Sequence, residues 1–123
     1  MAKVSESIEL SLDIDAVWEV IRGVVESGDW TIHSVDRASF FVREPGDMFS
    51  RLFRHPTKVA IFLHEQSEHE TRIALHGSIF GFGPMQKARV RKVLARLRQT
   101  IEAAFEAAAA AGAEAHPEAD SGK

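Results

Sequence analysis

A long run of apolar residues at helical spacing, from Pro84 to about Ala111, constrains the fold more than any other stretch. Apolar side chains recur in it at three- and four-residue steps, which predicts one buried stripe on a helix of about seven turns. Pro84 suits the first helical turn, where its missing N–H costs no hydrogen bond, and Gly112 is typical of a helix end. We therefore expect a C-terminal helix that covers what the shorter elements leave open. The stripe consists of Val90, Val93, Leu94, Leu97, Ile101, Ala104, Phe105 and Ala108.

Shorter periodic segments precede this helix. Strict alternation of apolar and polar residues is typical of half-buried strands, whereas Asp13 or Asp15 can cap a helix that continues to about Glu26. A turn near Asp36 makes a hairpin of the second and third strands. The predicted strands cover residues 8–12, 30–35, 38–44, 57–66 and 71–80.

The order of elements is therefore strand, helix, four strands and long helix. Because the last four strands have short connections, we expect an antiparallel sheet, and because its apolar side needs cover, we expect the C-terminal helix to pack on it. This is an α+β fold. One compact domain should cover residues 1–111, and residues 112–123, which lack core-forming side chains, should form a disordered tail.

The opening of the chain carries a family resemblance. Residues 7–18, Ser-Ile-Glu-Leu-Ser-Leu-Asp-Ile-Asp-Ala-Val-Trp, resemble the first strand and helix of the helix-grip superfamily, the START-like and polyketide-cyclase-like proteins. The final amphipathic helix is similar to the C-terminal helix of that superfamily, and the strand count is also that of a TATA-binding-protein-like half-domain. The resemblance implies a sheet closed by the long helix around an apolar ligand site. Since this chain is shorter than most members, we expect a compact variant, and none of the family's varied catalytic residues carries over.

A short helical stripe lies between the third and fourth strands, in residues 46–56. Three interpretations remain open: the stripe closes the end of the core, forms a lid over a ligand, or touches a membrane surface. The candidate pocket or lid residues, on this segment and on the two helices, are Trp18, Met48, Phe49, Leu52, Phe53 and Leu97.

Six basic residues and no acidic one lie between positions 87 and 98, at the start of the long helix. They can be a solvated surface paired with glutamates of the first helix or of a neighbouring subunit, or they can bind a polyanion such as nucleic acid. The candidate anion-binding residues, which border one side of the apolar stripe, are Lys87, Arg91 and Arg98. The other three, on the opposite side of the helix, are Arg89, Lys92 and Arg96.

The side of the sheet away from the helices should carry an unusual mixture of aromatic and imidazole groups. Exposed aromatic side chains of this kind favour a partner, and a second copy of the chain is the most available one. A metal site would need more converging ligands than the sequence offers here. The expected oligomer surface consists of His33, Phe41, Phe62, His64 and His76.

Several chemistries find no support in the sequence. The chain has no cysteine, which excludes disulfides and thiolate chemistry and fits a reducing compartment. No nucleophile elbow or metalloprotease motif occurs, and residues 81–84 read as a tight turn rather than a phosphate loop. We expect no catalytic residue, no metal and no cofactor. Because the first residues lack the apolar core of a signal peptide and no membrane-spanning run occurs, we expect a cytoplasmic protein.

These observations favour a non-enzymatic binding module that holds a small apolar ligand or a protein partner between the long helix and the sheet, with self-association. The alternative is a nucleic-acid- or polyanion-binding protein that uses residues 87–98. A polyketide-cyclase-like enzyme is the third hypothesis.

Overall fold

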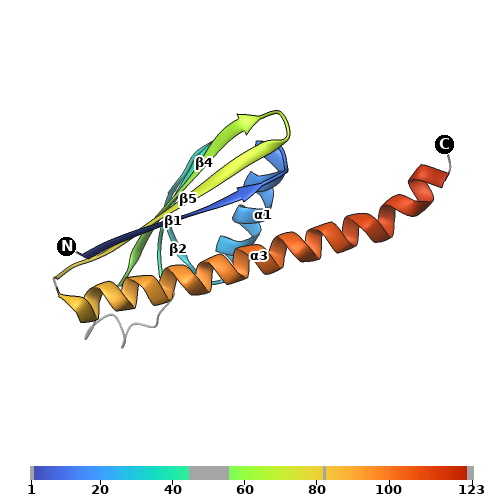
Figure 1. The fold of residues 1–123 in the computed structure, drawn as a ribbon. Coiled ribbons are helices and arrows are strands. Elements are labelled where there is room, and N and C mark those ends of the chain that lie inside the picture. Colours follow the sequence, from blue (N-terminus) through green and yellow to red (C-terminus); the bar gives the residue numbers. More distant parts are fainter. Residues whose placement is uncertain (1, 45–55, 82, 122–123) are drawn as a thin grey trace.

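A computed structural model of the chain describes residues 2–44, 56–81 and 83–121, with side chains as far as Ala110. Figure 1 shows two layers, a twisted sheet on one side and two helices on the other. The elements in chain order are β1 (Ala2–Leu10), α1 (Ile14–Ser27), β2 (Thr31–Val35), β3 (Ser39–Arg43), β4 (Lys58–Ser67), β5 (Glu70–Ile79) and α3 (Pro84–Ser121).

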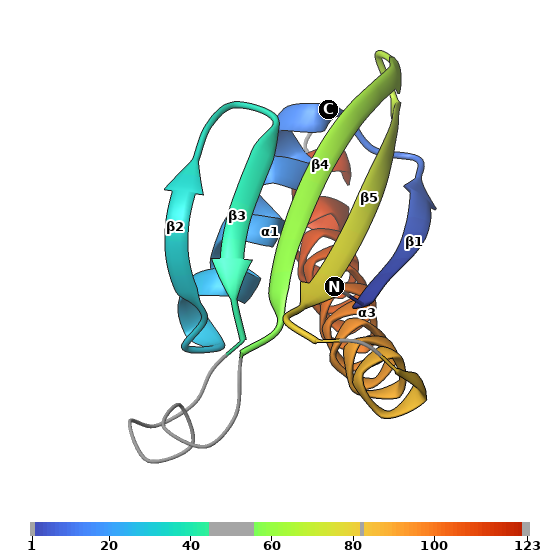
Figure 2. The same cartoon turned by 90° about the vertical axis from the view of Figure 1, so that its left-hand side faces the viewer.

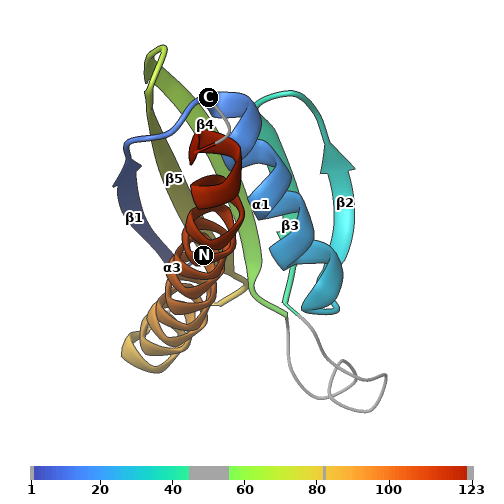
Figure 3. The same cartoon turned by 90° about the vertical axis from the view of Figure 1, so that its right-hand side faces the viewer.

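The sheet has the strand order β1-β5-β4-β3-β2, and every pair of neighbours is antiparallel. Strands β2 to β5 follow one another as a meander, because short connections favour pairing between consecutive strands. The first strand pairs with the last, so the chain crosses the sheet through α1 between β1 and β2. Figures 2 and 3 show the two faces: one carries α1 and α3, and no helix of the described residues covers the other.

Local signals define both ends of α1. The carboxylate of Asp13 accepts a hydrogen bond from the Ala16 N–H at 3.2 Å, as expected of an N-cap. At the other end, the Gly28 N–H donates to the Val24 carbonyl at 3.0 Å, and Asp29 adopts a positive φ of 60° as the chain turns into β2.

The core lies between the helices and one face of the sheet. Phe40, Ile61, Ile73 and Leu75 point from the strands toward the helices and are fully buried. The apolar stripe of α3 is also buried, as predicted, with Val90, Leu94, Leu97 and Ile101 each no more than 1% exposed. Packing at this density makes the core sensitive to changes of a single methyl group.

Gly77 on β5 is where α3 comes closest to the sheet. A Cβ atom added there would lie 2.7 Å from Cγ1 of Val90 and 3.1 Å from Cγ of Leu94, closer than carbon atoms can approach without displacement. Only glycine therefore lets Val90 and Leu94 rest directly on the strand. At this point no ligand fits between α3 and the sheet.

Two bounds differ most from the sequence prediction. β1 begins at Ala2 rather than at residue 8, because β5 supplies partners along its whole length, from Ala2 opposite Ile79 to Leu10 opposite Thr71. α3 continues past Gly112, the expected end, to Ser121. A glycine inside a helix costs only about 1 kcal/mol relative to alanine, so alone it is a weak stop. Figure 1 shows the end of α3 extending beyond the sheet, and the domain boundary at residue 111 stays a prediction.

Candidate functional site

The strand register arranges the outer face of the sheet, the face away from the helices, into rows of neighbouring side chains. Each row crosses the sheet from β1 through β5 and β4 to β3, because opposite residues in an antiparallel pair lie side by side. The first row, named here the cationic row, is Lys3, Ser78, Lys58 and Arg43. The second row is Ser5, His76, Ala60 and Phe41, and the third is Ser7, Ala74, Phe62 and Ser39.

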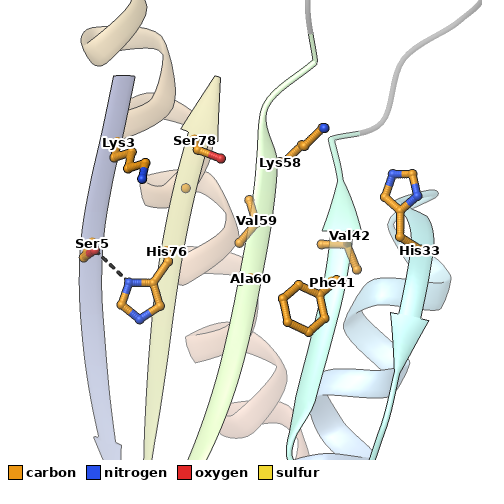
Figure 4. A pocket seen from close by; sticks show the side chains of 11 residues that line it. Lys3, Ser5, His33, Phe41, Val42, Lys58, Val59, Ala60, His76 and Ser78 are labelled. Atoms are coloured by element: carbon orange, nitrogen blue, oxygen red, sulfur yellow. Dashed lines mark hydrogen bonds between the residues drawn. The ribbon is translucent and has the colours of Figure 1, made fainter. Parts of the chain in front are cut away.

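A pocket of about 450 Å³ lies over the first two rows. Its volume is within the range of about 300–1,000 Å³ that is typical of small-molecule sites. Figure 4 shows its side chains rising from all five strands. We call it the outer-face pocket, and its outward-pointing residues are Lys3, Ser5, His33, Phe41, Lys58, Ala60, His76 and Ser78.

The shape of this pocket follows from side-chain size. Ser78 and Ala60 are small residues at the middle of the two rows, and larger side chains stand on either side of them. Lys3 and Lys58 flank Ser78, and His76 and Phe41 flank Ala60, so the surface is hollowed along the middle of the sheet.

His33 reaches the pocket through a β-bulge. The register between β2 and β3 shifts between Ile32 and Ser34, which leaves His33 as the extra residue on β2. Bulges redirect side chains in this way. Ile32 lies opposite the buried Val42, on the side of the sheet that faces the helices, but it is 41% exposed because β2 is a short strand at the edge of the sheet.

A hydrogen bond joins two polar residues on the β1 side of the pocket. The Ser5 Oγ and the His76 Nδ1 lie 2.8 Å apart, and the imidazole tautomer decides which atom donates. Figure 4 shows the two side chains meeting across the β1–β5 pair. The bond fixes the orientation of the imidazole ring at the pocket wall.

The aromatic groups of the outer face form one cluster centred on Phe62. The ring of Phe62 meets the rings of Phe41 and His76 edge-on, each at a centroid distance of 5.6 Å, and stacks on the ring of His64 at 6.4 Å. Phe41 is nonetheless 40% exposed. The structure thus brings together four of the five residues predicted for an oligomer surface, with His33 across the pocket, and their role stays a prediction.

Charge is distributed unevenly around the pocket. Among the described residues that line it there are two lysines and two histidines but no aspartate or glutamate. Lys58 also lies directly opposite Arg43 on β3, and like charges in that position repel. In addition, the Arg43 Nε is buried without a hydrogen-bond acceptor in the part of the chain that the structure describes.

His64 and His76 are not placed to share a metal ion. Their strands pair, but His64 lies opposite Arg72 and His76 opposite Ala60, so the ring of Phe62 separates the two imidazoles. Within residues 2–44, 56–81 and 83–121, no group of three or more histidine or acidic side chains is arranged as a metal site.

The residues predicted for a ligand pocket or lid do not line the outer-face pocket. Leu97 is 1% exposed in the core between α3 and the sheet. Trp18 is half-buried on α1, where its ring packs against Phe40 at 5.5 Å and its Nε1 donates to the Asp36 carbonyl at 2.8 Å. The other four candidates, Met48, Phe49, Leu52 and Phe53, lie outside the described residues.

Trp18 borders a second pocket of about 410 Å³ with Asp36 and Arg37. The Ala38 N–H donates to the Asp36 carboxylate at 2.9 Å. This bond, followed by hydrogen bonds from Ser39, lowers the pKa of Asp36 below its ordinary value. The carboxylate thus stabilises the β2–β3 turn.

The basic residues of α3 divide into paired and unpaired groups. Arg89 pairs with Glu44 at the end of β3, and Arg98 pairs with Glu6 of β1 and Glu102 of α3. The expected pairing with glutamates of α1 is not seen among the described residues, because Glu19 and Glu26 both pair with Arg22 of α1 itself. The exposed members without an ion pair in the described part of the chain are Lys87, Arg91, Lys92 and Arg96.

Sequence reasoning missed most of the pocket. It named His33, Phe41 and His76, but not Lys3, Ser5, Lys58, Ala60 or Ser78. The sequence did contain a pattern that indicates these residues. Along β1 the polar residues 3, 5 and 7 alternate with positions that face the core, so their side chains share one side of the strand. Only the pairing of β1 with β5 brings them beside His76.

No protein-family model matches the chain, and no curated protein matches its sequence. Its fold is nevertheless similar to that of solved structures. A START superfamily protein from Mycobacterium smegmatis has a TM-score of 0.63 at 10% identity, with 86% of this chain and 98% of that chain covered. DynU16, from the dynemicin biosynthetic locus, has a TM-score of 0.60 at 15% identity, with 86% of this chain and 48% of that chain covered. XoxI from Bacillus cereus has a TM-score of 0.51 at 14% identity, with 87% and 95% covered.

These similarities define the class of fold. The chain has a START-like helix-grip fold, an α+β architecture of five antiparallel strands and a long C-terminal helix, as the sequence predicted. At these identities the likeness concerns the fold alone, and function must be argued from the residues of the site. None of the described helices is long and apolar enough to cross a bilayer.

Proposed function

We propose that this chain is a non-enzymatic binding module that holds a small molecule with an apolar surface in the outer-face pocket. The observation that carries the proposal is the pocket itself, about 450 Å³ in volume, with Phe41 and Ala60 beside polar groups at defined positions. A mostly apolar hollow with a few converging polar groups is the usual form of a ligand site.

The location differs from the one that the family resemblance implies. The resemblance favours a ligand between the long helix and the sheet, but Gly77, Val90 and Leu94 are in such close contact there that not even a methyl group could be added. Leu97 and Ile101 extend the same packed surface along α3. These contacts support a site on the opposite face of the sheet.

The test uses N-phenyl-1-naphthylamine, a neutral apolar probe whose fluorescence rises in apolar surroundings. The parent should bind it, and Phe41→Ala should weaken binding about fivefold or more, because the ring that walls the pocket is lost. The matched control is Leu12→Ala. Leu12 is 39% exposed, close to the 40% of Phe41, but it comes after the C-terminal end of β1, whereas the pocket lies at the N-terminal end of that strand. Absence of probe binding, or equal loss in both variants, would refute the proposal.

Self-association is a second candidate function, favoured by the exposure of Phe41 beside the ring of Phe62. Exposed aromatic clusters are enriched where proteins meet. In this alternative a second copy of the chain covers the outer face, and the aromatic cluster forms the middle of the contact. The oligomeric state in solution tests it directly.

Catalysis is the weaker interpretation of the same site. Ser5 and His76 form a serine–histidine pair, but nucleophilic catalysis also needs a third group that orients the imidazole. No carboxylate within the described residues accepts a hydrogen bond from His76. If the pair is structural, the parent and Ser5→Ala will hydrolyse p-nitrophenyl acetate at the same background rate.

The polyanion alternative keeps four exposed cations on α3 as its candidates, Lys87, Arg91, Lys92 and Arg96. It predicts binding to heparin that weakens steeply with salt.

The absence of cysteine suits a reducing compartment, and a cytoplasmic location is kept as part of the main proposal.

A further inference from the structure

We infer that the ligand of the outer-face pocket is an amphipathic anion: a single carboxylate or sulfonate group bound at the cationic row, with a flat apolar body lying over Ala60 toward Phe41. The inference rests on the proposed function and adds the chemical class of the ligand. Three observations support it: the positive charge of the pocket, the repulsion between Lys58 and Arg43, and the order of the rows.

Charge is the first argument. Lys3 and Lys58 stand at the two sides of Ser78, and neither forms an ion pair within the described residues. His33 and His76 add positive charge when protonated and cannot add negative charge. Because no acidic side chain among the described residues lines the pocket, an anion meets attraction there from every charged neighbour.

Uncompensated repulsion is the second argument. Lys58 and Arg43 are direct cross-strand neighbours, an arrangement that destabilises a sheet. By contrast, Arg22 is neutralised by Glu19 and Glu26, and Arg98 by Glu6 and Glu102. An anion between Lys3 and Lys58 would neutralise the cationic row in the same way.

The order of the rows is the third argument. The cationic row borders the row that contains Ala60 and Phe41, and the ring of Phe62 follows in the next row. A ligand along the hollow therefore meets cations at one end and aromatic surface at the other. The hydroxyl of Ser78 lies between the two lysines, where it can donate to the anionic group.

The test compares two probes that differ only in the anionic group. 8-Anilinonaphthalene-1-sulfonate is N-phenyl-1-naphthylamine with a sulfonate added. The parent at low salt should bind the sulfonate about tenfold more tightly, because a charge-assisted contact is added to the same apolar contact. This advantage should shrink as salt is raised, since the lysines are exposed.

Variants locate the site. Lys58→Gln and Lys3→Gln should each weaken sulfonate binding about threefold to tenfold and leave the neutral probe unchanged. The matched control is Lys92→Gln, because Lys92 is an exposed lysine on α3, in the other layer of the fold. Circular dichroism confirms that each variant is folded.

Each other outcome has a defined meaning. Equal affinity for the two probes, with both lost in Phe41→Ala, would overturn the inference and leave the proposed function standing. Sulfonate binding that is lost in Lys92→Gln and retained in Lys58→Gln would overturn the inference in favour of α3. If neither probe binds the parent, the proposed function and the inference both fall.

Discussion

Replacing Gly77 by alanine tests the packing that excludes a ligand from the helix side of the sheet. The added Cβ would lie 2.7 Å from Cγ1 of Val90, which is fully buried and belongs to α3. Because valine has a single strongly preferred rotamer in a helix, its methyl group cannot rotate away. Either Val90 leaves its rotamer or α3 moves from the sheet.

The expected change in the free energy of unfolding of Gly77→Ala is the sum of two opposing effects. Overpacking a core by one methyl group costs about 1–3 kcal/mol. Gly77 is not among the residues with a positive φ, so alanine is compatible with its backbone and recovers about 0.4–1 kcal/mol by restricting the unfolded chain. We therefore expect a net loss of about 1–2 kcal/mol in the free energy of unfolding.

Urea denaturation followed by tryptophan fluorescence measures this loss, and two further variants make it diagnostic. Gly23→Ala is the matched control, because an added Cβ there meets nothing within 4 Å on α1, and it should stabilise by about 0.5–1 kcal/mol. In the background of Val90→Ala the closest contact, at 2.7 Å, is removed and the contact with Leu94 at 3.1 Å remains, so the cost of Gly77→Ala should become smaller. A Gly77→Ala protein as stable as the parent, or additive effects in the double variant, would refute the argument.

Further predictions concern other parts of the fold. Leu97→Ala should cost about 2–5 kcal/mol in the same urea experiment, and a loss below about 1 kcal/mol would mean that the α3 stripe is not packed as described. Lys58→Glu should raise stability by about 0.2–1 kcal/mol, because it pairs with Arg43, while abolishing sulfonate-probe binding; unchanged stability would contradict the repulsion between these residues. If the outer face self-associates, light scattering should show a dimer for the parent and a monomer for Phe62→Glu, and a monomeric parent would exclude this candidate. Because the folded-state pKa of Asp36 is lowered, its contribution to stability is present above the ordinary value of 3.8 and is lost as pH falls below it. The stability difference between the parent and Asp36→Asn should therefore narrow in that acidic range, and a constant difference would contradict the assignment.

The elements themselves could be predicted from the sequence because their signals are local. Pro84 begins α3, as predicted, and Asp13, one of the two candidate caps in the sequence, caps α1. The stripe through Leu94, Leu97 and Ile101 is buried, as its spacing of three and four residues required. Alternation along β3 and β4 also predicted correctly that Phe41 and Phe62 share the face away from the helices.

The candidate site could be predicted only in part. Its aromatic and imidazole members were found by alternation within single strands, but Lys3 and Ser5 lie on a stretch of β1 that the local pattern did not mark as strand. The position of His33 depends on a bulge, which a strict two-residue period cannot represent. The exposure of Ile32 follows from the place of β2 at the edge of the sheet.

What the sequence by itself determined is the set of elements, their order and their apolar faces, since each depends on residues a few positions apart. The tertiary structure alone decided which strands are neighbours. Ser5 and His76 are 71 positions apart, yet the pairing of the first strand with the last brings them to 2.8 Å. The same pairing places Lys3 beside Ser78 and so completes the cationic row. Contacts of this kind depend on the packing of all the elements at once. One face of the sheet must be buried against α1 and α3, and this requirement selects the strand order and register. The same order and register then determine which side chains are neighbours on the other face.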